Sequence, residues 1–167
     1  MKNTEMLGLT AGSSDADQFV TFCIGDEIYG VEVLRVQEII GMTTITHVPD
    51  TVTFMKGVIN LRGAVVPVVD MRLKFKMEDR AYDSFTVIII VEIKGRLVGM
   101  IVDTVSDVAN IPLDSIQDTP HFTTRIETDF IKGIGQLEAR LVIILDVERI
   151  MTTEEIRSID VKESSVA

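Results

Sequence analysis

The chain has 167 residues, with 26 acidic against 16 basic side chains, and its formal net charge is −10. This balance argues against a nucleic-acid partner and against an anionic membrane surface, because both attract clusters of lysine and arginine. One cysteine excludes a disulfide framework within the chain, and two histidines leave few ligands for a His/Cys metal site. The apolar runs are too short to cross a bilayer, and no secretory signal begins the chain, so the composition predicts a cytoplasmic protein without direct membrane insertion.

Residues 1–16 are small and polar, and we expect them to form a flexible N-terminal tail. Residues 17–160 are expected to fold, and 161–167 are expected to form a second tail. Runs of valine, isoleucine and other branched side chains predict strands, because such residues pack well on a pleated surface. The predicted strands are 19–24, 28–33, 58–61, 64–69, 85–92, 97–102 and 141–146.

Helical signals are fewer and shorter. Residues 49–57 run from a proline to a glycine and predict one or two capped turns. Thr152 stands three residues before Glu155, which is the spacing of a capping box. Ile156 and Ile159 would then form the apolar stripe of a short C-terminal helix over 152–160.

The chain also repeats itself. Residues 54–70 match 130–146 at an offset of 76, with 6 identities in 17 positions, and 30–39 match 99–108 at an offset of 69. Two interleaved units of about 70 residues, each with four or five strands, predict two similar β-barrels over approximately 30–80 and 85–150. Barrels of this size have little core of their own, so we expect them to pack against each other.

Candidate catalytic or metal-ligating residues lack the neighbours that such chemistry requires. This group, for which structural roles are expected, consists of Cys23, His47, Asp70, His121 and Asp146. The glycines at 57 and 63 superficially suggest a phosphate loop, but the segment lacks the Lys and Ser/Thr that must follow the last glycine. The sequence therefore predicts no enzyme, no cofactor and no metal site.

Arg62 is the most informative charged residue, because it stands between apolar residues in a run otherwise suited to burial. A guanidinium there needs an acceptor, and Glu38 is the partner we expect, although a solvated strand residue is an equal alternative. Pro67 cannot donate a hydrogen bond to a sheet, which predicts an edge or a bulge nearby.

Several motifs together resemble the CheW family of chemotaxis coupling proteins. The signature-like run at 54–72 reads FMKGVINLRGAVVPVVDMR, and the similarity continues through GDEIYGV at 25–31, VQEI at 36–39 and VGMIVDTVSDV at 98–108. It covers about residues 18–160. The regulatory domain of the histidine kinase CheA and the protein CheV share this resemblance, but this chain is too short for their additional domains.

The resemblance implies an all-β fold of two five-stranded SH3-like barrels with a few short helices. It implies a non-catalytic scaffold, monomeric when free, that couples CheA to methyl-accepting chemoreceptors and is recruited to membrane-associated receptor arrays. It also implies that the receptor's helical hairpin packs at the groove between the barrels. Carried over residue by residue, that receptor-binding surface would comprise Val36, Glu38, Gly57, Arg62 and Ile88, with a structural ion pair between Glu38 and Arg62. The second repeat has Glu138 in place of Arg62, so this surface belongs to the first repeat.

Two of these residues have structural alternatives. Ile88 lies in a run that also reads as a buried strand, and Gly57 could instead mark a backbone turn with positive φ. For the whole protein, the alternative is a barrel that binds a small ligand or an oligonucleotide. The acidity of the chain and its aromatic content of 5% argue against oligonucleotides, whose bases need aromatic stacking partners.

Overall fold

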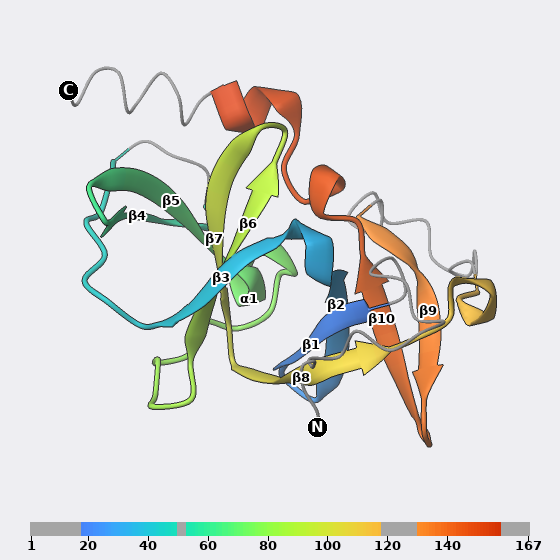
Figure 1. Ribbon diagram of the computed structural model, residues 1–167. Coiled ribbons are helices and arrows are strands. Elements are labelled where there is room, and N and C mark those ends of the chain that lie inside the picture. The colour runs from blue at the N-terminus through green and yellow to red at the C-terminus, as the bar shows by residue number, and fades with distance from the viewer. Residues whose placement is uncertain (1–17, 50–52, 118–129, 158–167) are drawn as a thin grey trace.

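The structure, a computed structural model, describes residues 18–49, 53–117 and 130–157. Strands dominate these residues, which confirms the predicted all-β class (Figure 1). The strands are β1 (Gln18–Ile24), β2 (Glu27–Glu32), β3 (Val36–Gly41), β4 (Met55–Leu61), β5 (Ala64–Asp70), β6 (Val87–Ile93), β7 (Arg96–Val102), β8 (Thr104–Asn110), β9 (Ile131–Leu137) and β10 (Arg140–Leu145). A short helix, α1 (Met71–Lys74), follows β5, and single 3₁₀ turns occur at η2 (Val33–Arg35), η3 (Leu113–Ser115) and η5 (Val147–Arg149).

The strands form two five-stranded sheets, one for each barrel. Barrel 1 has the order β3-β6-β7-β5-β4, and barrel 2 has the order β8-β1-β2-β10-β9. The two orders are equivalent when β1 to β5 are matched with β6 to β10. The internal repeat in the sequence is therefore a repeat of structure.

The boundary between the barrels differs from the expected division between residues 80 and 85. Hairpin β1–β2 pairs in parallel with β10, and hairpin β6–β7 pairs in parallel with β5. Each half of the chain thus contributes its hairpin to the barrel completed by the three strands of the other half. The correction has a physical reason: a parallel neighbour can come from a distant part of the chain, and the sequence repeat does not show which copy supplies it.

The largest hydrophobic core lies between the barrels. Side chains from both sheets meet there, including Phe22, Tyr29, Ile89 and Met100. Each barrel has only a small separate core of five or six buried residues. Strand β6 serves both cores, because alternate side chains of a strand point to opposite faces: Ile88 and Ile90 fill barrel 1, while Ile89 and Val91 face the shared core.

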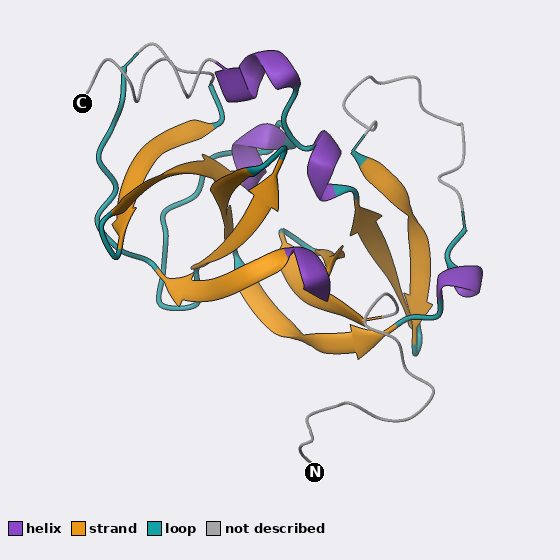
Figure 2. Cartoon of the chain, turned by 45° about the horizontal axis from the view of Figure 1, so that its top comes forward, coloured by secondary structure: helices purple, strands orange, loops and turns teal. Residues whose placement is uncertain are grey.

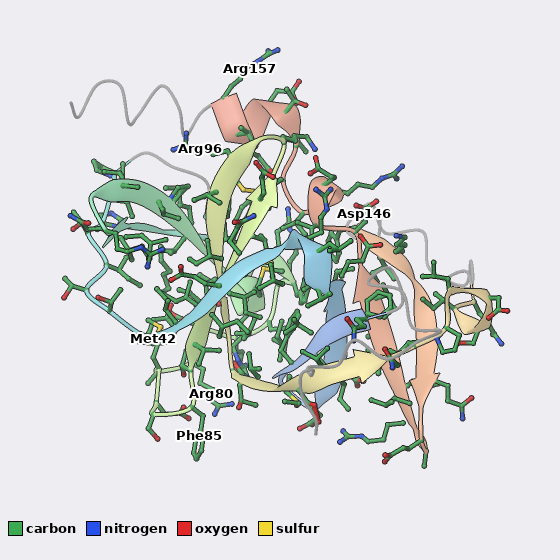
Figure 3. All side chains as sticks on the ribbon, viewed as in Figure 1. Met42, Arg80, Phe85, Arg96, Asp146 and Arg157 are labelled. Carbon is green, nitrogen blue, oxygen red and sulfur yellow. The ribbon has the colours of Figure 1, made fainter. Side chains whose placement is uncertain are left out.

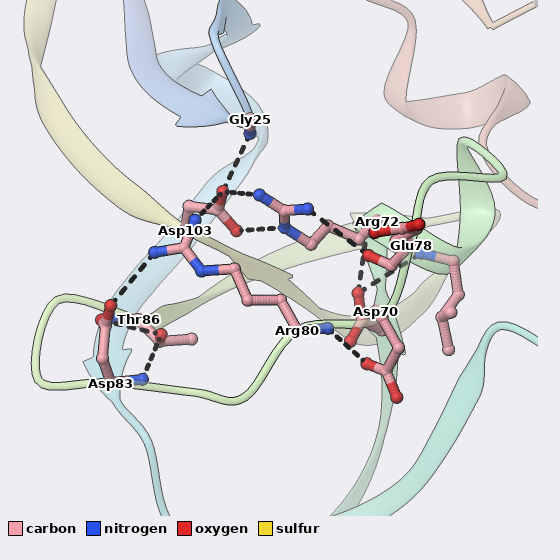
Figure 4. Close-up of polar contacts among 10 residues, drawn as sticks. Gly25, Asp70, Arg72, Glu78, Arg80, Asp83, Thr86 and Asp103 are labelled. Atoms are coloured by element: carbon pink, nitrogen blue, oxygen red, sulfur yellow. Dashed lines mark hydrogen bonds and ion pairs between the residues drawn. The ribbon is translucent and has the colours of Figure 1, made fainter.

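An ion pair connects the barrels beside this core (Figure 4). Arg72 Nε and Nη2 donate to the two carboxylate oxygens of Asp103, at 2.9 and 2.7 Å. Asp103 lies at the crossover from β7 to β8, and its carboxylate also accepts the backbone N–H of Gly25, in the β1–β2 turn of barrel 2, at 2.8 Å. Because only 14% and 16% of the two side chains are exposed, the pair is shielded from solvent.

The loop between α1 and β6 is attached to the same network. Arg80 donates to Asp103 at 3.3 Å and to Asp83 at 3.2 Å. The Asp83 carboxylate in turn accepts the backbone N–H of Phe85 at 2.9 Å and that of Thr86 at 3.2 Å. These contacts fix the loop, and the exposed Phe85 side chain projects outward from it (Figure 3).

The two predicted helical segments had different outcomes. The capping box is present: Glu155 N donates to Thr152 Oγ1 at 3.1 Å and Thr152 N donates to Glu155 Oε1 at 2.8 Å. The helix occupies 153–157 of the described residues, and Ile156 is buried as expected, whereas Ile159 lies outside them. The prediction for 49–57 was wrong over its described C-terminal part, where Met55 already begins β4.

Asp103 should make stability depend on pH. Burial raises the pKa of its carboxyl, but the hydrogen bonds from Arg72 and from Gly25 N–H outweigh that effect, and the net pKa is lowered. A lowered folded-state pKa stabilises the fold above the unfolded-state value of about 3.9. That stabilisation is lost as the pH falls through the lower folded-state value.

We therefore predict that Asp103→Asn lowers the free energy of unfolding by about 2 kcal/mol at neutral pH. The difference from the wild type should shrink as the pH falls from about 4 through the lowered folded-state pKa of Asp103, because the wild-type carboxyl then becomes protonated and neutral, like the asparagine side chain. Urea unfolding at several pH values measures both effects. Asp107→Asn, on the exposed part of β8, is the control and should change stability by less than about 0.5 kcal/mol. A pH-independent loss at Asp103 would contradict the electrostatic explanation.

Candidate partner-binding surface

Arg62 and Glu38 form the expected ion pair on barrel 1. Arg62 Nη1 donates to Glu38 Oε2 at 3.0 Å, and Nη2 donates to Oε1 at 2.5 Å. This two-bond arrangement matches the planar guanidinium to the carboxylate and fixes their relative orientation. The hydrogen bonds from Arg62 lower the pKa of the Glu38 carboxyl, and the pKa of Arg62 is raised in return by its hydrogen bonds to Glu38.

The local backbone explains why Arg62 reaches Glu38. Arg62 and Gly63 form the two-residue turn between β4 and β5, and their φ values are 52° and 92°. Positive φ at both central positions is typical of the tight turns that suit the twist of a hairpin. Asn60 Oδ1 accepts the N–H of Gly63 at 2.8 Å and stabilises this turn. The turn therefore places Arg62 at the tip of the β4–β5 hairpin.

The ion pair joins the two edges of the barrel 1 sheet. Glu38 lies on β3, and Arg62 follows β4, the strand at the opposite end of the sheet order. The pair therefore bridges the gap across which the sheet closes into a barrel. The exposed fraction of the Arg62 side chain is 70%, against 29% for Glu38, so Glu38 orients Arg62 while leaving much of it accessible.

Apolar side chains are exposed on the strands that carry the pair. Ile39 follows Glu38 on β3, and Val65 lies on β5 close to the turn. Val36, at the start of β3, is half-buried. Sequence reasoning included Val36 but missed Ile39 and Val65. Strand alternation could have indicated them only if the face of each strand that turns toward solvent had been known.

Gly57 is buried and does not form part of an open surface. Its φ is +152°, and a Cβ atom built on it would lie 2.1 Å from the carbonyl oxygen of Thr46. Thr46 and Val58 exchange two backbone hydrogen bonds of 2.8 Å there, which hold the segment before β4 across the glycine. Glycine is thus required by the close approach of two backbones. The positive φ agrees with the structural alternative, but Gly57 lies within β4 and not in a turn.

Ile88 requires a correction, because it is fully buried. It lies in the small core of barrel 1, where it pairs with Ile40 of β3 and with Ile101 of β7 in the sheet. It cannot contact a partner in this conformation and can only support β3 from beneath. The direct receptor contacts assigned to Val36, Glu38 and Arg62 stay predictions.

Barrel 2 lacks an equivalent ion pair. The positions that match Glu38 and Arg62 in the repeat are Asp107 and Glu138, which are both acidic. Glu138 keeps the turn conformation of Arg62, with φ of 57° against 52°. The turn geometry is therefore repeated without the charge pair, and the candidate surface is confined to barrel 1.

The other polar residues singled out in the sequence have structural surroundings. Asp70 is buried, caps α1 through Arg72 N–H at 2.9 Å, and accepts the Tyr82 hydroxyl at 2.8 Å. Asp146 caps η5 in the same way, at 3.1 Å from Glu148 N. Cys23 is half-buried, His47 is exposed, and His121 lies outside the described residues. No group of three or more potential metal ligands occurs within 18–49, 53–117 and 130–157.

The helices that the structure describes are all too short or too polar to span a bilayer. The fold and the site together define a β protein of two barrels, one of which presents on its surface an arginine held by an ion pair. Comparison with known proteins identifies the family to which this class of protein belongs. The family model described as CheW-like domain matches residues 18–155, so the chain belongs to the CheW-like family.

Similar proteins agree with that membership. The chain is 39% identical over 150 residues to the chemotaxis protein CheW of Klebsiella aerogenes, covering 90% of each chain. It is 34% identical to the chemotaxis protein CheW of Rhizobium meliloti, covering 83% of this chain and 89% of the relative. The crystal structure of the scaffolding protein TtCheW from Thermoanaerobacter tengcongensis superposes with a TM-score of 0.77 at 35% identity, over 84% of this chain and 95% of that one.

The burial of Gly57 leads to a prediction on stability. Gly57→Ala should lower the free energy of unfolding by about 3 kcal/mol, because the new methyl group forces two paired backbones apart at an unfavourable φ. For a chain of this size that corresponds to a fall in Tm of roughly 10 °C.

Gly41→Ala is the matched control, because nothing lies within 4 Å of a Cβ built at that strand position. Its Tm should change by no more than about 2 °C. Thermal unfolding and partner binding should be measured on the same samples. Loss of binding by Gly57→Ala with an unchanged Tm would contradict the structural role and return Gly57 to the binding surface.

Proposed function

We propose that this protein is a chemotaxis scaffold that couples the histidine kinase CheA to the cytoplasmic tips of methyl-accepting chemoreceptors. The observation that carries the proposal is the exposed Arg62, held by two hydrogen bonds to Glu38 on a barrel of CheW-like fold. An arginine whose orientation is fixed before binding loses little side-chain freedom when a partner docks. On this proposal the protein acts through its surfaces and catalyses no reaction.

The receptor contact is proposed on barrel 1, around the turn between β4 and β5. Arg62 supplies a cation there, and Ile39 on β3 and Val65 on β5 supply exposed apolar area on the same barrel. A surface that combines an arginine with exposed aliphatic side chains fits a receptor helix that combines an apolar stripe with acidic or carbonyl acceptors. The buried Ile88 of β6 supports this surface by packing beneath β3.

The kinase contact is proposed on other parts of the barrels. The regulatory domain of CheA is a paralogue of this fold, so contact between like barrels would join the two proteins. Binding the receptor and the kinase at separate surfaces makes the chain a bridge. The protein would then be cytoplasmic and monomeric when free, and recruited to receptor arrays at the membrane.

We predict that Arg62→Ala weakens receptor binding about tenfold or more and lowers receptor-coupled kinase activation, while the fold is retained. Removing the side chain deletes the exposed cation, and the largely surface location of Arg62 spares the hydrophobic cores. Co-sedimentation with a receptor signalling fragment, with and without CheA, measures the effect, and circular dichroism checks the fold. Arg140→Ala, at an exposed arginine on β10 of barrel 2, is the control.

A charge exchange separates the two possible roles of the pair. The double variant Glu38→Arg/Arg62→Glu can restore an ion pair but places the opposite charge at the exposed position. If the exchange stays defective, the exposed cation itself meets the receptor, as proposed. If it recovers full binding, the pair acts only by closing the barrel. Full co-sedimentation and kinase activation by Arg62→Ala would overturn the assignment altogether.

A further inference from the structure

Hairpin β1–β2 is separated in the sequence from the other strands of barrel 2. Barrel 1 is contiguous, because its strands β3 to β7 all lie within residues 36–102. Barrel 2 instead combines the hairpin at 18–32 with β8, β9 and β10 at 104–145. The strands of the two barrels form separate groups connected by turns and short helices (Figure 2). The hairpin can therefore leave its place without breaking the sheet of barrel 1.

The place of the hairpin in barrel 2 is specific. The hairpin lies between β8 and β10, where β1 pairs antiparallel with β8 and β2 pairs in parallel with β10. Its side chains Phe19, Phe22 and Ile24 are fully buried in the folded chain. A free hairpin would expose them to water and would leave the edges of β8 and β10 unpaired. Both consequences are removed when a hairpin of this sequence returns, either from the same chain or from a second copy.

The connection between the hairpin and barrel 1 is the single 3₁₀ turn η2. None of its three residues is buried, and the exposed fraction of Leu34 is 64%. Arg35 Nη2 donates to a carboxylate oxygen of Glu148 at 2.7 Å, but 32% and 37% of the two side chains are exposed, so the pair holds the turn only weakly. Opening η2 therefore breaks few contacts, and its three residues would span up to about 10 Å when extended.

Closing barrel 2 within one chain has an entropic cost. The partners of the hairpin lie far along the chain, beyond the whole of barrel 1, and closing so long a loop is unfavourable. Linked segments meet at an effective concentration in the millimolar range, so a second copy at about 1 mM competes with the chain's own β8 and β10. The exchanged hairpin would regain the same contacts, including the hydrogen bond from Gly25 N–H to Asp103. Exchange between copies is therefore a low-cost route to a dimer.

From these features we propose that two copies of this chain exchange their β1–β2 hairpins when they refold together at about millimolar concentration. In the resulting dimer η2 is extended, and each barrel 2 combines β8, β9 and β10 of one copy with the hairpin of the other. Barrel 1 of each copy is the same as in the monomer, so the dimer carries two Arg62 surfaces. Because returning to the monomer requires the hairpins to leave both barrels, the dimer persists after dilution.

Cys23 on β1 provides a direct test, because its Sγ lies 4.0 Å from Ser106 Oγ on β8. A cysteine in place of Ser106 would bring two thiols together across these strands, where a disulfide can form. The test mixes two full-length chains: the wild type, in which Cys23 is the single cysteine, and Cys23→Ala/Ser106→Cys, which carries a tag that changes its mass. Since each chain has one cysteine, the disulfide between β1 and β8 forms only between exchanged copies.

The two chains are unfolded together in urea, refolded at about 1 mM or about 10 µM, and then oxidised at the same dilution. Gel electrophoresis without reductant should show the tagged–untagged disulfide after refolding at the higher concentration, and at least about tenfold less of it at the lower one. Chains that are refolded separately at the lower concentration and then mixed are the control and should not form it. Light scattering should show a dimer that persists after dilution.

A second variant tests the hinge without relying on the disulfide. Inserting Gly-Ser-Gly-Ser between Leu34 and Arg35 should lower the dimer fraction at least about fivefold, because a longer hinge lets the hairpin return to its own barrel. An unchanged dimer fraction in this variant would overturn the proposal, as would the absence of a dimer after refolding at about 1 mM, or equal disulfide in the separately refolded control. The measurements involve neither receptor nor kinase, so they stand apart from the proposed function. Thermal unfolding confirms that each variant is folded.

Discussion

The shared core between the barrels is the feature on which the rest of the structure depends. Each barrel alone encloses only five or six buried side chains, too few to stabilise a domain of its size. The exchange of hairpins β1–β2 and β6–β7 solves this problem, because each half of the chain completes the other half's sheet. The two halves of the chain are thereby joined by two parallel strand pairings, one within each barrel, and the barrels share a continuous apolar interior.

The polar network around Asp103 completes this union where the chain crosses between barrels. Arg72 lies in α1, directly after β5 of barrel 1, while Gly25 belongs to the β1–β2 turn of barrel 2. One carboxylate therefore joins three segments that are remote in sequence. The shared core and this network hold the two barrels against each other.

The charge distribution shows how two similar barrels acquire different roles. The β4–β5 and β9–β10 turns have the same conformation, yet one carries Arg62 opposite Glu38 and the other carries Glu138 opposite Asp107. Two carboxylates at the equivalent positions repel each other and form no ion pair, so barrel 2 holds no cation in a fixed orientation there. The net charge of −10 then makes the exposed cations distinctive, because most of the surface repels an acidic partner.

Local patterns in the sequence determined a large part of this protein. Runs of branched residues marked most strands, Thr152 and Glu155 marked the C-terminal helix start, and the motif around Arg62 indicated both the family and the ion pair. These features can be predicted from the sequence because each depends either on contacts between residues close together in the chain or on an entire sequence motif. The sequence repeat also predicted two barrels, and it contained the signal for β9, which repeats β4.

Only the tertiary structure decided which strands share a barrel and which side chains face a partner. Parallel pairing of β2 with β10 and of β5 with β7 joins segments far apart in sequence, and neither copy of the repeat specifies its partner. The face of β6 that points inward buries Ile88, and the approach of Thr46 to Gly57 depends on a backbone contact that no local pattern reveals. Phe54 and Phe130 likewise come together beneath Lys74 only through folding.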